Sequence, residues 1–201
     1  LFEGSGPSRE ARYTSGMKHL TVLVPISFVL FVGSACSSLQ GGVVGQEQRT
    51  VSEEDYERIK SLAGDWYLVG GERLGKVIEP NLEEPFLSYA ITSAGHSVVE
   101  KLFVDQPMQM TSVYYLDKGR LKMDHYCSLG NQPRMVAVSA SAENEIAFQT
   151  VEVGNMADKD TLHMSSHSFE FNGPGEMTVH WGATKGQEST GGSLYRVKKL
   201  E

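Results

Sequence analysis

From Gly64 onward, apolar and polar residues alternate with a period of two, and this pattern constrains the fold more than any other feature. Alternation of this kind is typical of β-strands with one buried face. No helical pattern of ten residues interrupts the strands, which argues against βαβ architectures. We therefore predict an all-β fold, a closed antiparallel up-and-down barrel of about ten strands, because closure removes both open sheet edges. The expected strands are Asp65–Gly70, Phe86–Thr92, Ser97–Val104, Met110–Leu116, Arg120–Cys127, Arg134–Ala140, Glu145–Val151, Leu162–Phe171, Glu176–Trp181 and Gly192–Lys198.

One short α-helix is expected before the strands. Ser52 can cap its start, three acidic residues follow and suit the positive end of the helix dipole, and Gly64 ends it. Its apolar residues fall on one helical face: Tyr56, Ile59, Leu62 and Ala63. We expect that face to lie against another element.

Composition excludes several classes of protein. The net charge of −7 and the pI of about 5.4 argue against a nucleic-acid partner, which would require a basic surface. Two cysteines are too few for a disulfide-dense scaffold or a cysteine-rich zinc module. A length of 201 residues with 40% apolar residues suits one globular domain with a tail.

An apolar stretch at residues 20–32 predicts a secretory signal peptide. It is shorter than the roughly 20 residues that span a bilayer, it follows a short basic start at Met17, and small residues come after it. The run Gly33-Ser34-Ala35-Cys36 resembles the bacterial lipobox, in which the cysteine is lipidated and becomes the first mature residue. Gly33 stands where an aliphatic residue is usual, and the same residues also fit ordinary cleavage after Ala35.

This resemblance implies a lipid-anchored protein of the bacterial cell envelope. Ser37 stands where aspartate signals retention in the inner membrane of enterobacteria, so the outer membrane, on its periplasmic side, is the expected location. The expected organisation is residues 1–16 as sequence upstream of the true start, 17–35 as signal peptide, 36–50 as lipidated N-terminus and flexible tether, and 51–201 as the barrel domain.

The run Leu62-Ala63-Gly64-Asp65-Trp66-Tyr67 resembles the Gly-x-Trp start of lipocalins and their calycin relatives. Those proteins place an arginine near the end of the last strand, over the tryptophan, and Arg196 matches it. The resemblance implies that Gly64, Trp66 and Arg196 close one end of the barrel, with the guanidinium on the indole. The segment from His125 to Met135 also resembles one seen in uncharacterised bacterial proteins of lipocalin-like fold.

The alternating faces of two strands predict what lines the barrel interior. The apolar face of residues 120–127 also carries a histidine and the second cysteine, and the face of 162–171 with two phenylalanines also carries two histidines. A barrel of about ten strands is wider than side chains easily fill, so we expect a ligand cavity. The candidate ligand-binding residues are His125, Cys127, His163, His167, Phe169, Arg134 and Met123.

Metal and catalytic sites have weaker support. His163 and His167 would lie about 13 Å apart on a strand, too far to share one ion without a bend. A nucleophile pair of Cys127 and His125 would need an orienting group and an oxyanion site, and neither is visible, so a buried inert thiol is the preferred interpretation.

The sequence thus favours a non-enzymatic, envelope-anchored, lipocalin-like protein that binds a small, largely apolar molecule, without a required cofactor. Two alternatives stay open. One is a haem- or metal-dependent enzyme on the same barrel, with a histidine as ligand. The other is a structural envelope lipoprotein without a ligand.

Overall fold

The computed structural model describes residues 53–200. The expected signal peptide, Cys36 and the tether lie outside these residues. One helix, α1 (Glu53–Lys60), precedes eleven strands. The strands are β1 (Gly64–Arg73), β2 (Lys76–Ile78), β3 (Leu87–Thr92), β4 (Ser97–Leu102), β5 (Met110–Asp117), β6 (Arg120–Tyr126), β7 (Gln132–Val138), β8 (Glu145–Gly154), β9 (His163–Gly173), β10 (Glu176–Lys185) and β11 (Glu188–Lys198).

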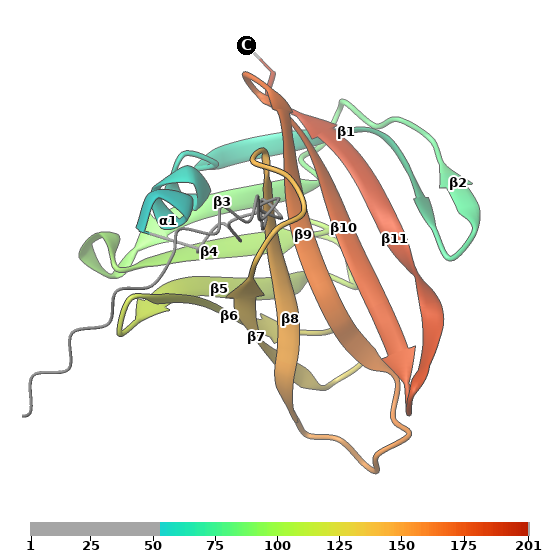
Figure 1. Cartoon of the computed structure of the whole chain (residues 1–201). Coiled ribbons are helices and arrows are strands. Elements are labelled where there is room, and N and C mark those ends of the chain that lie inside the picture. The colour runs from blue at the N-terminus through green and yellow to red at the C-terminus, as the bar shows by residue number, and fades with distance from the viewer. Residues whose placement is uncertain (1–52, 201) are drawn as a thin grey trace, which may run out of the picture. The chain divides into compact units, whose positions relative to one another are not determined.

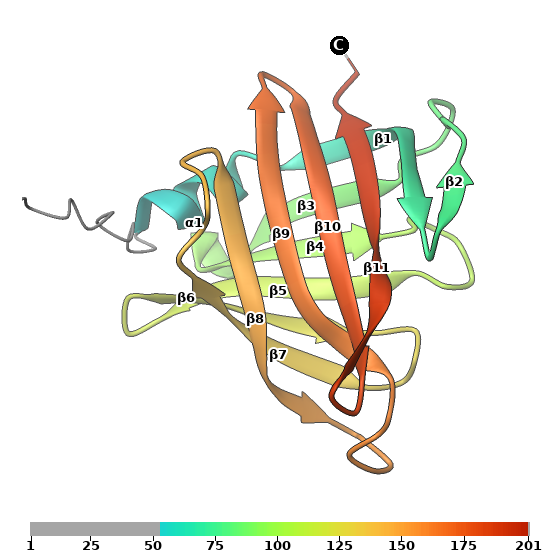
Figure 2. The same cartoon turned by 45° about the vertical axis from the view of Figure 1, so that its right-hand side comes forward.

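The strands form a closed antiparallel barrel, as predicted. Neighbours in the chain pair with each other from β3 to β11, and β1 completes the circle by pairing with both β3 and β11. The short strand β2, which the alternation pattern did not predict, pairs with the end of β1. It forms a hairpin on the side of the barrel away from α1 (Figures 1 and 2). The barrel itself therefore has ten strands, β1 and β3–β11.

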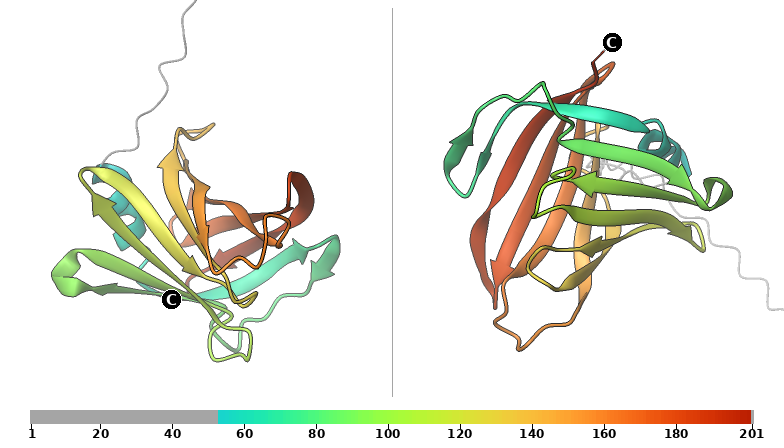
Figure 3. Two further views of the ribbon diagram at one scale, coloured as in Figure 1. Left: turned by 90° about the horizontal axis from the view of Figure 1, so that it is seen from below. Right: turned by 180° about the vertical axis from the view of Figure 1, so that it is seen from behind.

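Two groups of strands run in crossing directions. Strands β3–β7 run across strands β8–β11, and both groups curve around a shared interior (Figures 1 and 3). Because the strands are antiparallel, alternate loops gather at opposite ends of the barrel. The connections β4–β5, β6–β7, β8–β9 and β10–β11 share one end, and α1 lies toward the other.

Helix α1 covers one end of the barrel. Its Ile59 is fully buried, and the Arg58 guanidinium lies 4.2 Å from the centre of the Phe171 ring while it donates to the Glu143 carbonyl at 3.2 Å. Trp66, at the start of β1, is also buried and donates from Nε1 to the carbonyl of Leu62 at 2.7 Å. This end is therefore closed by packed apolar side chains.

The cation on the Trp66 ring is Lys199, which differs from the role expected for Arg196. Lys199 Nζ lies 5.2 Å from the centre of the ring and donates to the carbonyls of Ser61 and Ala63, at 3.2 and 2.9 Å. Arg196 is exposed and pairs across the β1–β11 seam with Gly70. The alternation of β11 explains the difference, because buried Tyr195 and Val197 point inward and leave Arg196 outside.

Candidate functional site

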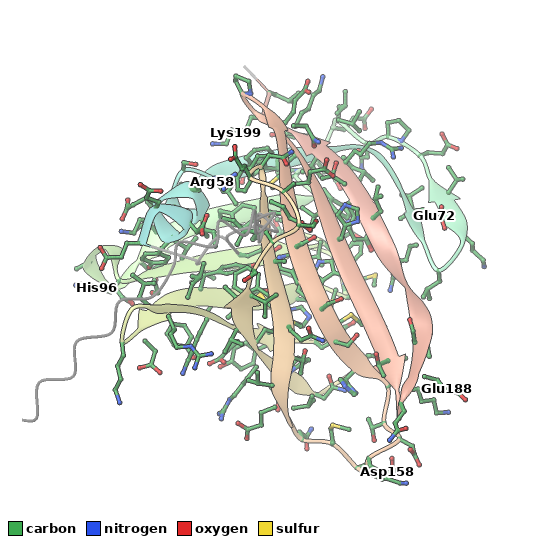
Figure 4. The ribbon with its side chains drawn as sticks, viewed as in Figure 1. Arg58, Glu72, His96, Asp158, Glu188 and Lys199 are labelled. Atoms are coloured by element: carbon green, nitrogen blue, oxygen red, sulfur yellow. The ribbon has the colours of Figure 1, made fainter. Side chains whose placement is uncertain are left out.

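A cavity of about 330 Å³ opens at the end of the barrel away from α1. Figure 4 labels Arg58 and Lys199 near the closed end. It labels Asp158, on the β8–β9 loop, and Glu188, at the start of β11, at the cavity end. The cavity volume falls in the lower range of small-molecule sites. The walls are largely apolar and include Leu102, Phe103, Met110, Leu162, Met164 and Tyr195. Among the lining residues only Arg73 and Lys185 are charged, and both are cationic.

The β6–β7 turn forms part of the mouth and is held by its own hydrogen bonds. The backbone N–H of Cys127 donates to the carbonyl of Asn131, and the Asn131 amide donates to the carbonyl of Leu162 in the neighbouring β8–β9 loop at 2.8 Å. Gly130 has a φ of 84°, the left-handed region that glycine adopts without strain. The turn lies within the segment His125–Met135. Its hydrogen bonds hold Cys127 at the cavity.

Two aromatic rings meet where the cavity reaches the barrel core. His125 on β6 is 1% exposed, Trp181 on β10 is 5% exposed, and their ring centres lie 4.4 Å apart. The ring of His167 also stacks on that of Trp181, with the ring centres 4.1 Å apart. His125 and Trp181 both line the cavity, and we call them the cavity floor.

A buried polar network lies next to the floor and is centred on Glu100 of β4. Its carboxyl group contacts the hydroxyls of Tyr89 at 3.2 Å and Tyr114 at 2.6 Å, and it also hydrogen-bonds Ser112. The Tyr114 hydroxyl also lies 3.2 Å from His167 Nε2. Glu100 is fully buried, and burial raises the pKa of its carboxyl although the three hydroxyls partly offset the effect.

The hydrogen bonds of this network require one shared proton. His167 Nδ1 lies 3.0 Å from the carbonyl of His180, which can only accept, so Nδ1 carries a hydrogen. Tyr114 has one hydrogen for two neighbours, so a second hydrogen must come from His167 Nε2 or from the Glu100 carboxyl. Burial lowers the pKa of His167 to about 3 and raises that of Glu100. The neutral arrangement is therefore favoured, with the proton on Glu100 and the Tyr114 hydroxyl donating to His167.

Ser112 connects this network to the cavity floor. Its hydroxyl hydrogen-bonds Glu100 and lies 3.0 Å from His125 Nδ1. The Ser112 hydroxyl satisfies both partners when its hydrogen is donated to Glu100 and its oxygen accepts a hydrogen bond from Nδ1–H of His125. Burial lowers the pKa of His125 to about 4, so the ring is neutral at pH 7. With its hydrogen on Nδ1, His125 has a lone pair on Nε2.

His163 does not line the cavity, contrary to the sequence-based expectation. Gly182 pairs with Ser166 but Ala183 pairs with Met164, so Ser165 has no partner on β10 and forms a β-bulge. A bulge adds one residue and reverses which side chains face inward. Met164 therefore lines the cavity. His163 is half-buried outside it and donates from Nδ1 to the carbonyl of Thr161.

Arg134 also does not line this cavity, contrary to the sequence-based expectation. It lies on the outer face of β7 with a side chain 59% exposed, where it donates to Glu152 at 3.2 Å and lies 4.0 Å from Asp124. Met135 beside it is buried, so alternation directs the guanidinium to the surface. Its two carboxylate neighbours balance its charge there.

Three further candidates face inward but belong to the packed core. Met123, His167 and Phe169 are at most 2% exposed, and none of them lines the cavity. The half of the barrel near α1 is thus filled by side chains and the half near the loops is hollow. Of the seven candidates, His125 and Cys127 line the cavity.

Glu100 was missed although the sequence carries a signal for it. One face of β4 carries Val98, Glu100 and Leu102 at every second position, and all three are buried. A carboxyl group on an apolar strand face indicates a buried polar site with partners. Trp181 was not among the expected binding residues, because its unpaired N–H depends on what surrounds it in the fold.

Comparison with known proteins leaves the chain without an assigned family. No family model matches the sequence, and no curated protein matches it. The closed barrel of ten antiparallel strands fits the calycin fold that the sequence resembles. Over residues 53–200, no three His, Cys, Asp or Glu side chains are placed to hold a metal ion. Within the same residues, no helix is long and apolar enough to cross a membrane.

Proposed function

We propose that this protein binds a small, largely apolar molecule in the cavity at the open end of the barrel. The observation that carries the proposal is the cavity itself, whose walls are apolar and whose volume is about 330 Å³. The opposite half of the barrel is packed, so the cavity is bounded by a rigid floor rather than by a loose core. Pockets of this type are the usual sites for small ligands.

The site supports binding more than catalysis. The Cys127 thiol donates to Met110 Sδ at 3.9 Å, and burial raises the pKa of this thiol. A nucleophilic cysteine requires the opposite shift, toward the thiolate. A thiol in this environment serves as part of the apolar wall.

A cavity-filling substitution tests the proposal. N-phenyl-1-naphthylamine, an uncharged apolar dye, is expected to bind the wild-type protein saturably, with a rise in fluorescence. Ala183 lines the cavity and is buried, so Ala183→Leu fills part of it and is expected to weaken dye binding at least tenfold. Ala90→Leu is the matched control, because Ala90 is exposed on β3. Absence of saturable binding, or equal binding by both variants, would contradict the proposal.

We also propose that Cys36 anchors the domain in the bacterial envelope, on the lipobox resemblance of Gly33-Ser34-Ala35-Cys36. The envelope is where a lipid-linked protein can hold a small apolar molecule close to a membrane. In bacterial cells, Cys36→Ala is expected to abolish incorporation of a labelled fatty acid into the protein. Unlabelled wild-type protein would exclude the lipid anchor, and Cys127→Ala, which should keep the label, is the control.

A further inference from the structure

The cavity floor holds two buried polar atoms without a partner. Within residues 53–200, His125 Nε2 and Trp181 Nε1 make no hydrogen bond. The two side chains are 1% and 5% exposed and come from strands β6 and β10, which meet across the cavity. An unpaired buried polar atom is costly and rare in folded proteins. Two of them at one floor therefore indicate the place of a ligand group.

The two atoms have opposite hydrogen-bonding roles. Indole Nε1–H is always a donor. The Ser112 hydroxyl has one hydrogen and donates it to Glu100, which assigns the hydrogen in the 3.0 Å contact with Ser112 to His125 Nδ1 and makes Nε2 the acceptor. A group that satisfies both atoms must donate one hydrogen bond and accept another.

We propose that the ligand is an apolar alcohol or phenol whose hydroxyl lies at the cavity floor, where it donates to His125 Nε2 and accepts from Trp181 Nε1–H. This inference rests on the proposed binding function and specifies the ligand class. A hydroxyl is the smallest group with both roles on one atom. It also leaves the rest of the ligand to contact the apolar walls.

Charged groups fit the floor poorly. A carboxylate has no hydrogen to donate to His125 Nε2, and the cations Arg73 and Lys185 belong to the cavity lining rather than to the floor pair. A buried charge without a partner is strongly unfavourable. An ammonium group would lack a carboxylate, because none of the cavity-lining residues within 53–200 is acidic. A ketone would pair with Trp181 and leave His125 without a hydrogen bond.

Three probes of similar size separate these possibilities. Calorimetric titration of the wild-type protein at pH 7.5 compares 2-naphthol, 2-methylnaphthalene and 2-naphthoate. We expect 2-naphthol to bind at least tenfold more tightly than either of the others. The hydrocarbon leaves both floor atoms unpaired, and the carboxylate cannot satisfy His125.

The two indole N–H signals provide a second measurement with an internal control. The chain has two tryptophans, and Trp66 Nε1 already donates to the carbonyl of Leu62. In ¹H–¹⁵N NMR spectra, 2-naphthol is expected to shift the Trp181 indole signal downfield and to leave that of Trp66 in place. Trp181→Phe identifies the signal by its loss. This variant is expected to prefer 2-naphthol over 2-methylnaphthalene by a smaller factor than the wild-type protein, because only His125 still pairs with the hydroxyl.

The possible results separate this inference from the proposed function. If all three probes bind with equal affinity, binding in the cavity stands and the hydroxyl inference falls. Tightest binding of 2-naphthoate would show that the cavity selects an anion, through the floor or through Arg73 and Lys185, which also overturns the inference. If none of the probes and no apolar dye binds, the proposed function itself fails.

Discussion

Glu100→Ala is expected to lower the free energy of unfolding by about 4 kcal/mol. The substitution leaves a cavity in the barrel core and removes the partner of the Tyr89, Tyr114 and Ser112 hydroxyls, which are all buried. Glu100→Gln, in contrast, is expected to stay within about 1 kcal/mol of the wild-type protein at pH 7. An amide is uncharged, as the protonated carboxyl is, and it also donates on one side and accepts on the other.

Urea unfolding followed by circular dichroism measures both variants. The comparison tests the protonation of Glu100, since an ionised carboxylate would accept every hydrogen bond and an amide would place a hydrogen against one of the donors. If Glu100→Gln destabilises the protein as much as Glu100→Ala, the neutral network is wrong. Agreement of Glu100→Gln with the wild-type protein supports a shared proton on Glu100.

Stability is expected to fall as the pH is lowered from about 6 to about 5, with contributions of opposite sign. Burial lowers the pKa of His125 to about 4 and that of His167 to about 3, so unfolding in this range takes up about two protons. The pKa of Glu100 is raised in the fold, so unfolding releases its proton. This release offsets part of the uptake, so the slope of the wild-type protein is expected to lie below about 2.7 kcal/mol per pH unit, the value for two protons.

Two variants separate these contributions. Glu100→Gln removes the opposing release, so its slope should rise to about 2.7 kcal/mol per pH unit. His125→Asn keeps a donor for Ser112 but does not titrate, so its slope should fall by about 1.4 kcal/mol per pH unit relative to the wild-type protein. Urea unfolding at pH 5.0, 5.5 and 6.0 measures the slopes. Identical slopes for the three proteins would show that these groups are not buried as described.

The placement of individual residues shows what local patterns can predict. On β6, the alternation correctly places Leu121, Met123 and His125 inside, because no bulge interrupts the strand up to these positions. On β9 the same argument fails at His163, because the bulge at Ser165 depends on pairing with β10. A Cβ at Gly182 would collide with Ser166 Oγ, so the bulge uses a glycine on the neighbouring strand. The glycine that permits the bulge therefore lies on a different strand from the bulge, and the pattern of β9 alone does not reveal it.

The candidate site also contains residues that local patterns predict and residues that they do not. His125 and Cys127 could be predicted as lining residues from their strand alone, and Arg134 could have been excluded by its alternation with Met135. The role of Trp181 could not, because its ring meets His125 only when β6 and β10 face each other across the closed barrel. Which polar atoms stay unpaired is a property of all surrounding strands together.

By itself, the sequence determined the fold class, the single helix before the strands and the approximate strand limits. These depend on side-chain alternation and turn residues, which act over a few neighbouring positions. The tertiary structure decided the seam between β1 and β11, the bulge that exchanges His163 for Met164, and the division of the interior into a packed half and a hollow half. These depend on which strands meet and how their side chains fill the shared volume, and packing is set by residues far apart in the chain.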